Sequence, residues 1–249
     1  ICIVGAGATG GYLGVKLINA GFDVSLIARG LHLKAMKENG LTVIENEKEI
    51  KCSPICSDSM DKLGKMDFIF ITLKAYSIPG IVKQIEKMFD ENSSVITAYN
   101  GLPWWYFYNI NGKFKDYRIK CIDPNNIQWN VITPKRIIGC VVYPATEIIS
   151  PGIIKHIEGN RFSLGEPNGL KSERIVKISN ALVSSGLKAP IRNNIRQDIW
   201  TKLIGNLAFN PLSVITEESL DVLLSKKENR QIARSAMIEV EKIINKLGI

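Results

Sequence analysis

The sequence predicts an α/β protein in which a doubly wound, mostly parallel sheet with appended antiparallel strands is followed by an all-helical C-terminal domain. A short apolar run at the N-terminus leads straight into a glycine-rich turn and a helical pattern. Further apolar runs of strand length recur as far as residue 164. From Asn193 onward the pattern is helical without a strand signal. We therefore expect domains at 1–192 and 193–249, joined without a flexible linker.

Composition narrows the classes of function. A chain of 249 residues with 45% hydrophobic and 22% charged residues can bury a full core. No apolar run approaches the roughly 20 residues that a bilayer-spanning helix needs. Because the sequence opens directly into a strand, we also expect no signal peptide. The sequence begins without Met and ends just after a helical run. We therefore expect it to be part of a longer chain whose helical domain is incomplete here.

The distribution of charged residues and the spacing of the cysteines argue against several kinds of partner. The net charge of +8 comes from Lys and Arg scattered among acids, which fits an anionic small molecule at least as well as nucleic acid. The five cysteines have no framework spacing, and Cys52 and Cys56 lack a second ligand pair. We therefore expect a cytoplasmic protein without a metal site and with neither nucleic acid nor membrane as a partner.

The first apolar run, Ile1–Val4, feeds the sequence GAGATGG. Gly5, Gly7 and Gly10 form G-x-G-x-x-G between a strand and a helix, which is the context of a dinucleotide-binding loop. Such glycines permit a tight turn, an approach to pyrophosphate and close packing of helix on strand. The alternative is a glycine-rich turn in another α/β protein. We assign the following residues to the cofactor loop of a Rossmann-type domain: Gly5, Ala6, Gly7, Ala8, Thr9 and Gly10.

Arg29 indicates which dinucleotide binds. It ends the predicted strand Asp23–Ala28, nineteen positions past Gly10, close to where an NAD-binding fold places Asp or Glu for the ribose hydroxyls. No acid stands nearby, and an arginine attracts a 2′-phosphate. The cofactor is therefore expected to be NADPH. His32 and Lys34 can assist, or they can simply be surface residues at the start of a helix.

Two later strands end in polar residues. The run Asp67–Leu73 is followed by Lys74, and the run Ser94–Ala98 is followed shortly by Asn100. Ligands of open α/β sheets bind outside the carboxyl ends of the strands, so both residues are candidates for the ligand-binding edge. Either residue could instead only make a turn.

Three further segments complete the predicted sheet domain. Leu41–Pro54 reads as a pair of strands, and Ile137–Pro144 as a buried strand. Ile153–Ile157 and Asn160–Leu164 read as an antiparallel hairpin about Glu158-Gly159. The aromatic segment 102–129, which precedes the strand Ile137–Pro144, is more typical of a core or a subunit contact than of a membrane or nucleic-acid surface.

The stretch Asn193–Ser213 is the candidate for the chemistry. It predicts a helix that Asn193 or Asn194 caps and that Pro211 ends. Lys202, Asn206 and Asn210 are spaced i, i+4 and i+8, so they fall within roughly 80° of one another on the helix.

A solvated face is the simple interpretation of this stripe. Asn is nevertheless a poor helix former, and a solvated face has no reason to use it twice. The flanking residues are small or apolar, which predicts a largely enclosed helix: Gly205, Leu207, Ala208 and Phe209. A buried lysine beside carboxamides needs polar partners, and a polar substrate could supply them.

Together these stretches resemble the ketopantoate reductase family. The matching features are GAGATGG at 5–11, TLKA at 72–75, Asn100-Gly101, and NNIRQDIWTKLIGNLAFNPLS at 193–213. The resemblance implies a Rossmann domain, a helical domain, and NADPH-dependent reduction of a 2-oxo acid to the 2-hydroxy acid. The expected substrate is 2-dehydropantoate, which places the activity in pantothenate biosynthesis.

The resemblance also implies roles for individual residues. Lys202 becomes the catalytic lysine that hydrogen-bonds the ketone and supplies the proton, and Asn206 and Asn210 become substrate-binding groups. Asn100 is implied to lie near the nicotinamide and the lysine. Two cofactor contacts follow as well, Lys74 and the backbone near Ala145.

The sequence departs from the family at two places. Leu220 stands where these enzymes carry another substrate-binding Asn, and the family's downstream Ser and Glu fall beyond Ile249. Two alternative functions therefore stay open, a reductase of another 2-oxo acid and a non-catalytic NADP-binding sensor. The sequence also leaves a homodimer open.

Overall fold

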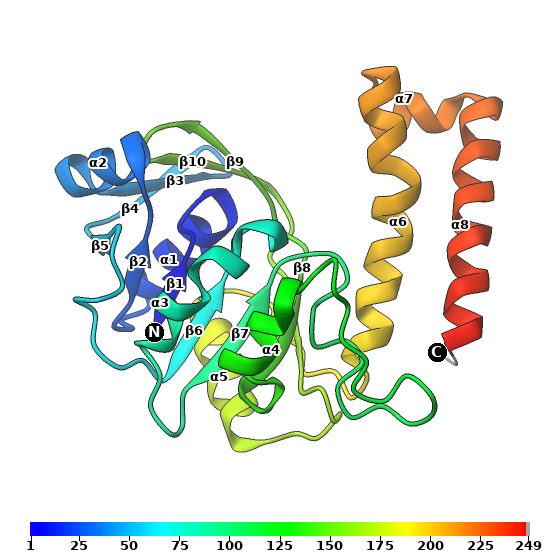
Figure 1. Ribbon diagram of the computed structural model, residues 1–249. Coiled ribbons are helices and arrows are strands. Elements are labelled where there is room, and N and C mark those ends of the chain that lie inside the picture. The colour runs from blue at the N-terminus through cyan, green and yellow to red at the C-terminus, as the bar shows by residue number, and fades with distance from the viewer. Residues whose placement is uncertain (248–249) are drawn as a thin grey trace. The chain divides into compact units, whose positions relative to one another are not determined.

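The computed structural model describes residues 1–247 and divides the chain into two compact units. Unit 1 consists of Ile1–Tyr99 and Pro103–Ile195, and unit 2 consists of Asn100–Leu102 and the chain from Arg196 onward. Figure 1 shows the sheets in unit 1 and the long helices in unit 2. Within the described chain, no helix combines the length and apolar character needed to cross a bilayer.

A seven-stranded sheet forms the centre of unit 1, in the order β11-β8-β7-β6-β1-β2-β5. Its strands are β1 (Cys2–Val4), β2 (Ser25–Ile27), β5 (Ile55–Ser57), β6 (Phe68–Ile71), β7 (Ser94–Ala98), β8 (Ile137–Val142) and β11 (Phe162–Gly165). All pair in parallel except β11, which runs antiparallel to β8. The central strands are buried throughout, as expected for apolar runs in a parallel sheet. The predicted sheet with an appended antiparallel strand is confirmed.

Helices follow several of these strands, and one of the helices comes after the last strand. They are α1 (Ala8–Asn19), α2 (Gly30–Asn39), α3 (Val82–Glu86), α4 (Ile127–Val131) and α5 (Glu173–Ser184), with 3-10 turns η1 (Ala75–Ser77), η2 (Pro79–Ile81), η3 (Pro124–Asn126) and η4 (Pro134–Arg136). Parallel neighbours need such crossovers because a tight turn cannot reverse the chain between them.

A second sheet of four strands has the order β4-β3-β10-β9. Its strands are β3 (Leu41–Glu45), β4 (Lys48–Cys52), β9 (Ala145–Ser150) and β10 (Ile153–Glu158). The predicted strand pair at 41–54 is present as β3 and β4, joined through Asn46 and Glu47 at positive φ. This sheet packs against α1, and Figure 1 shows it beside α1 and α2.

The hairpin predicted about Glu158-Gly159 is wrong. β10 pairs in parallel with β3 and antiparallel with β9, whereas β11 pairs with β8 in the other sheet. The two strands therefore separate after Glu158 and join different sheets. Strand alternation indicates which face is apolar, but it does not identify the partner, because pairing depends on distant segments.

The first aromatic residues of the segment 102–129 lie in the core of unit 1, although Tyr117 is exposed. Trp104, Trp105 and Tyr106 are buried, and the indole Nε1 of Trp105 donates to Thr97 Oγ1 at 3.1 Å. Of the interpretations weighed for this segment, the structure supports a core.

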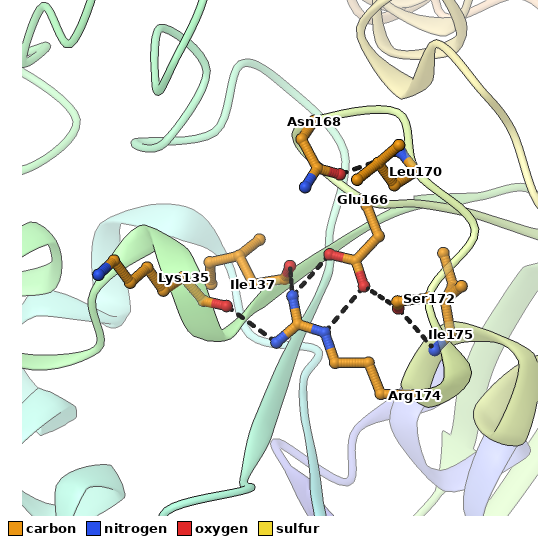
Figure 2. Close-up of polar contacts among 8 residues, drawn as sticks. All are labelled: Lys135, Ile137, Glu166, Asn168, Leu170, Ser172, Arg174 and Ile175. Carbon is orange, nitrogen blue, oxygen red and sulfur yellow. Dashed lines mark hydrogen bonds and ion pairs between the residues drawn. The ribbon is translucent and has the colours of Figure 1, made fainter.

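A buried ion pair joins the edge of the first sheet to α5 (Figure 2). Glu166, 3% exposed, follows β11, and Arg174 lies in the first turn of α5. Arg174 also donates to the carbonyl oxygens of Lys135 and Ile137, at 2.8 and 3.2 Å. Ser172 caps α5 and donates to Glu166 Oε1 at 2.5 Å. This cluster links the start of β8, the end of β11 and the start of α5.

Every regular element described in unit 2 is a helix, while Asn100–Leu102 and the connection at 217–219 are irregular. Its helices are α6 (Ile195–Thr216), α7 (Leu220–Ser225) and α8 (Lys227–Leu247), with Ile195 itself grouped in unit 1. The prediction that Pro211 ends the first helix is wrong, since α6 continues for five residues beyond it. Ala208 and Leu212, on either side of the proline, share one apolar cluster with Leu223 and Ala233. Packing on both sides therefore offsets the hydrogen bond that proline removes.

Candidate functional site

The glycine-rich loop between β1 and α1 has the geometry of an anion-binding turn. Gly5 has φ +105°, a conformation that other residues rarely adopt. A Cβ at Gly10 would lie 2.4 Å from the Gly5 carbonyl oxygen and 2.5 Å from Thr72 Oγ1. The amides of Gly5 and Ala6 both donate to the carbonyl oxygen of Ile27, at 3.0 and 2.7 Å. The loop is therefore held tightly against β2 and the end of β6.

The outer side of the same loop is open to a ligand. A Cβ at Gly7 would meet nothing closer than the Gly5 carbonyl oxygen at 4.0 Å. Gly7 is the N-cap of α1, without a side-chain cap and without an acid in the first turn. The first-turn amides, those of Ala8, Thr9 and Gly10, cannot bond within the helix. Uncapped amides at the positive end of a 12-residue helix fit a cofactor pyrophosphate.

Thr72 was not among the residues selected from the sequence as site residues, although it opens the TLKA stretch. Its hydroxyl donates to the carbonyl oxygens of Gly5, at 2.7 Å, and Val4, at 3.2 Å. It therefore fixes the glycine turn to the strand end that also places Lys74. Lys74 is exposed and directly precedes η1.

Arg29 and Ala145 lie in the same unit as the loop. Arg29 is exposed and is the N-cap of α2, two residues after the end of β2. Ala145 is the first residue of β9, and the hydroxyl of the next residue, Thr146, lies 3.4 Å from that of Thr9. Thr146 was missed at the sequence level because only the tertiary structure brings β9 to the start of α1.

Unit 2 contains the other candidate residues. Lys202, Asn206 and Asn210 lie on α6 at helical spacing. Lys202 and Asn206 are half-buried, but Asn210 is exposed and Leu207 is 45% exposed. The expectation of a largely enclosed helix is therefore not met at Leu207 and Asn210, and Lys202 and Asn206 are only partly covered.

Asn100 is grouped with unit 2, although it follows Tyr99 shortly after the end of β7. Its side chain is exposed. Lys74 follows β6, the parallel neighbour of β7. Both residues therefore come after carboxyl ends of adjacent strands, as the sequence analysis expected. In the described residues, no group of three or more His, Cys, Asp or Glu could hold a metal ion.

Comparison with known proteins adds an independent result. Residues 1–169 match the family described as ketopantoate reductase PanE/ApbA, and residues 194–249 match its C-terminal counterpart. The chain is 44% identical to a 2-dehydropantoate 2-reductase of Mesorhizobium japonicum over 250 aligned residues, which cover 100% of this chain and 77% of that protein. The chain belongs to the ketopantoate reductase family.

Solved structures agree with this assignment. A crystal structure described as that of a ketopantoate reductase from Ralstonia solanacearum has 34% sequence identity to this chain and a TM-score of 0.92. The match covers 97% of this chain and 75% of that one. D-mandelate dehydrogenase in a ternary structure with NADH and anilino(oxo)acetate has a TM-score of 0.83 at 21% identity, covering 100% and 75%. That second likeness shows the fold alone. As a member of the ketopantoate reductase family, the chain is an NAD(P)-dependent oxidoreductase.

The family match includes every candidate residue. The N-terminal match spans the glycine loop, Arg29, Lys74, Asn100 and Ala145, and the C-terminal match spans the polar stripe of α6.

Proposed function

We propose that this protein reduces 2-dehydropantoate to pantoate with NADPH, and that Lys202 donates the proton. The observation that carries the proposal is the stripe of Lys202, Asn206 and Asn210 on one helix of a chain 44% identical to a 2-dehydropantoate 2-reductase. A solvated helix face has no use for two carboxamides beside a lysine, whereas a 2-oxo acid offers oxygen atoms to all three groups.

Unit 1 supplies the cofactor-binding residues in this proposal. The first-turn amides of α1 hold the pyrophosphate, and Gly7 leaves room for its approach. Arg29 receives the 2′-phosphate, because a guanidinium forms paired hydrogen bonds with phosphate oxygens. Lys74 and the backbone at Ala145 complete the contacts. When bound, the reduced nicotinamide supplies a hydride to the keto carbon.

Unit 2 supplies the groups that act on the substrate. The Lys202 ammonium hydrogen-bonds the ketone oxygen, stabilises the negative charge that develops there, and then transfers a proton to it. Asn206 and Asn210 donate amide hydrogens to the substrate, and Asn100 orients it beside the lysine. The net charge of +8 favours the approach of an anionic acid and an anionic cofactor.

Leu220 favours a second candidate on the same site. It is the first residue of α7 and is 48% exposed, at the position where the family is expected to carry a polar substrate contact. An apolar side chain there would suit a 2-oxo acid that lacks the hydroxyl group of 2-dehydropantoate. The reaction would be unchanged.

The test is a substrate panel followed by the loss of NADPH absorbance. The panel contains 2-dehydropantoate together with aliphatic and aromatic 2-oxo acids. Lys202→Ala should lower kcat by about 10²- to 10⁴-fold, the usual contribution of general acid catalysis. Lys242→Ala, an exposed lysine on α8, is the matched control and should keep kcat. A normal kcat in Lys202→Ala would remove that role, and binding of NADPH without turnover of any acid would favour a sensor.

A further inference from the structure

His32 makes a hydrogen bond that determines where its proton lies. It sits in the first turns of α2, three residues after Arg29. The backbone amide of Gly152 donates to His32 Nδ1 at 3.0 Å. A backbone amide can only donate, so Nδ1 carries no proton, and the neutral ring carries its proton on Nε2.

His32 Nε2 is buried, and among the described residues it has no hydrogen-bond partner of good geometry. Burial lowers the pKa of His32 below its usual value, and the nearby backbone of Ala6 opposes this effect. Ala6 belongs to the glycine-rich loop. The imidazole therefore stands between that loop and the turn at Gly152.

The turn on the far side of the ring is itself fixed. Gly152 has φ +80° in the connection from β9 to β10, and its carbonyl oxygen accepts the amide of Thr42, on β3, at 2.9 Å. A Cβ at Gly152 would lie 3.1 Å from that of Ala35, on α2. The turn thus contacts both the second sheet and α2, so a link from it to His32 restrains the position of α2.

We propose that His32 is a positioning residue for the dinucleotide: its neutral ring holds the start of α2, and with it Arg29, between the glycine-rich loop and the β9–β10 turn. The inference rests on the proposed function in one respect, that the loop binds a nicotinamide cofactor. His32 does not touch the cofactor in this arrangement. It acts through the two backbone segments on either side of it.

Protonation of His32 would undo this arrangement. A proton on Nδ1 would point at the amide hydrogen of Gly152, so two donors would face each other and the hydrogen bond would be lost. The groups around the ring do not compensate. The glycine loop 5–10 and the turn 150–153 hold no titratable side chain, and the basic residues of α2 nearest in sequence, Arg29 and Lys34, are exposed. Cofactor affinity should therefore fall as the pH becomes acidic.

The chain offers a matched control, because it has two histidines. His156 also contacts α1 from the second sheet, with its ring stacked on Tyr12 at 4.7 Å between centroids. Its Nδ1 lies 3.5 Å from Glu45 Oε1, so this ring nitrogen faces a carboxylate and not a backbone amide. His156 is therefore a control for a histidine of the same unit that lacks the hydrogen bond from Gly152.

The experiment measures the dissociation constants of NADPH and NADH by fluorescence between about pH 8 and about pH 5, the range in which histidines titrate. NADH is included because it lacks the 2′-phosphate of NADPH, a group that itself titrates at about pH 6. Wild-type protein should lose affinity for both cofactors as the pH falls. His32→Leu should bind both about tenfold more weakly at pH 8, which is the loss of one hydrogen bond.

Two further variants separate positioning from a general effect on folding. Asn can accept the Gly152 amide but cannot be protonated, so His32→Asn should keep most of the affinity at high pH and lose the dependence on acid. His156→Asn should keep the acid-dependent loss. Nitrogen NMR of the two imidazoles provides a readout without cofactor, in which His32 should be unprotonated at Nδ1 and protonated at Nε2 in the neutral protein.

Two results would overturn the inference while leaving the proposed function intact. One is His32→Leu that binds both cofactors as tightly as wild-type protein at high pH. The other is a neutral His32 with its proton on Nδ1. Wild-type protein that binds neither cofactor at any pH would instead defeat the proposed function, and the positioning role with it.

Discussion

Arg174 and Glu166 form a two-bonded ion pair in which Nε lies 2.8 Å from Oε1 and a terminal nitrogen lies 2.6 Å from Oε2. The Glu166 side chain is buried, and the Arg174 side chain is 30% exposed. This geometry matches the planar fork of arginine to the two oxygens of glutamate. The pair fastens α5 to the edge of the seven-stranded sheet (Figure 2).

Arg174→Ala should therefore be strongly destabilising. Removal of one partner leaves the Glu166 charge buried without its guanidinium, which costs about 3–5 kcal/mol in comparable pairs. Urea unfolding measures the change in free energy. Lys87→Ala is the control, because Lys87 and Asp61 form a pair at 2.7 Å in which both side chains are more than half exposed. Such pairs contribute roughly 0–1 kcal/mol, so equal losses in the two variants would contradict the argument.

Gly10→Ala should damage the cofactor loop. The new methyl group would lie 2.4 Å from the Gly5 carbonyl oxygen, so the loop must move away from α1. Overpacking of this kind costs about 1–3 kcal/mol of stability, and a displaced loop should also weaken NADPH. Unfolding curves and cofactor titration measure both effects. A Cβ at Gly80 meets no atom within 4 Å, so Gly80→Ala should stay within about 0.5 kcal/mol of wild type.

Arg29→Asp should change the choice of cofactor. A lost charge-assisted hydrogen bond to phosphate costs about 1.5–3 kcal/mol, which corresponds to roughly 10- to 100-fold in the affinity for NADPH. NADH lacks the 2′-phosphate and should be affected far less. Arg29→Lys keeps the charge but not the planar fork of donors, so its affinity for NADPH should lie between those of wild-type protein and Arg29→Asp. Similar losses for NADPH and NADH would show that Arg29 does not meet the phosphate.

Glu45→Gln should remove an acid-sensitive part of the stability. Burial opposes ionisation of Glu45, but hydrogen bonds from Lys16, at 2.5 Å, and from Tyr12, at 3.1 Å, lower its pKa below the usual 4.5. A lowered pKa means that the stabilisation is fully present above about pH 4.5 and is lost as the pH falls through the folded value. The difference in unfolding free energy between wild type and variant should therefore be constant near neutrality and shrink in acid. A difference that does not change down to the lowest accessible pH would contradict this role.

Much of the fold was predictable because local rules apply to it. The apolar runs that became β6, β7 and β8 are long and uninterrupted, and the glycine spacing after β1 allows few turns other than the one found. The helix α5 begins at a serine cap and has an amphipathic pattern. For these elements, neighbouring residues contain the required information.

The errors occurred where distant residues decide. Pro211 is a helix breaker by local rules, but the cluster of Ala208, Leu212 and Leu223 continues the helix through it. The strands β10 and β11 have hairpin-like spacing, but they find better partners in different sheets. Their side-chain pattern would suit either pairing.

The sequence by itself determined the dinucleotide loop, the alternation of strand and helix in unit 1, and the alignment of one lysine with two amides along α6, because each follows from the fixed periods of strand and helix. Tertiary structure alone decided that His32 meets Gly152, 120 positions away, that Thr146 reaches the start of α1, and that a second sheet forms at all. Contacts between segments so distant in the chain depend on how whole elements pack, and no local spacing encodes that.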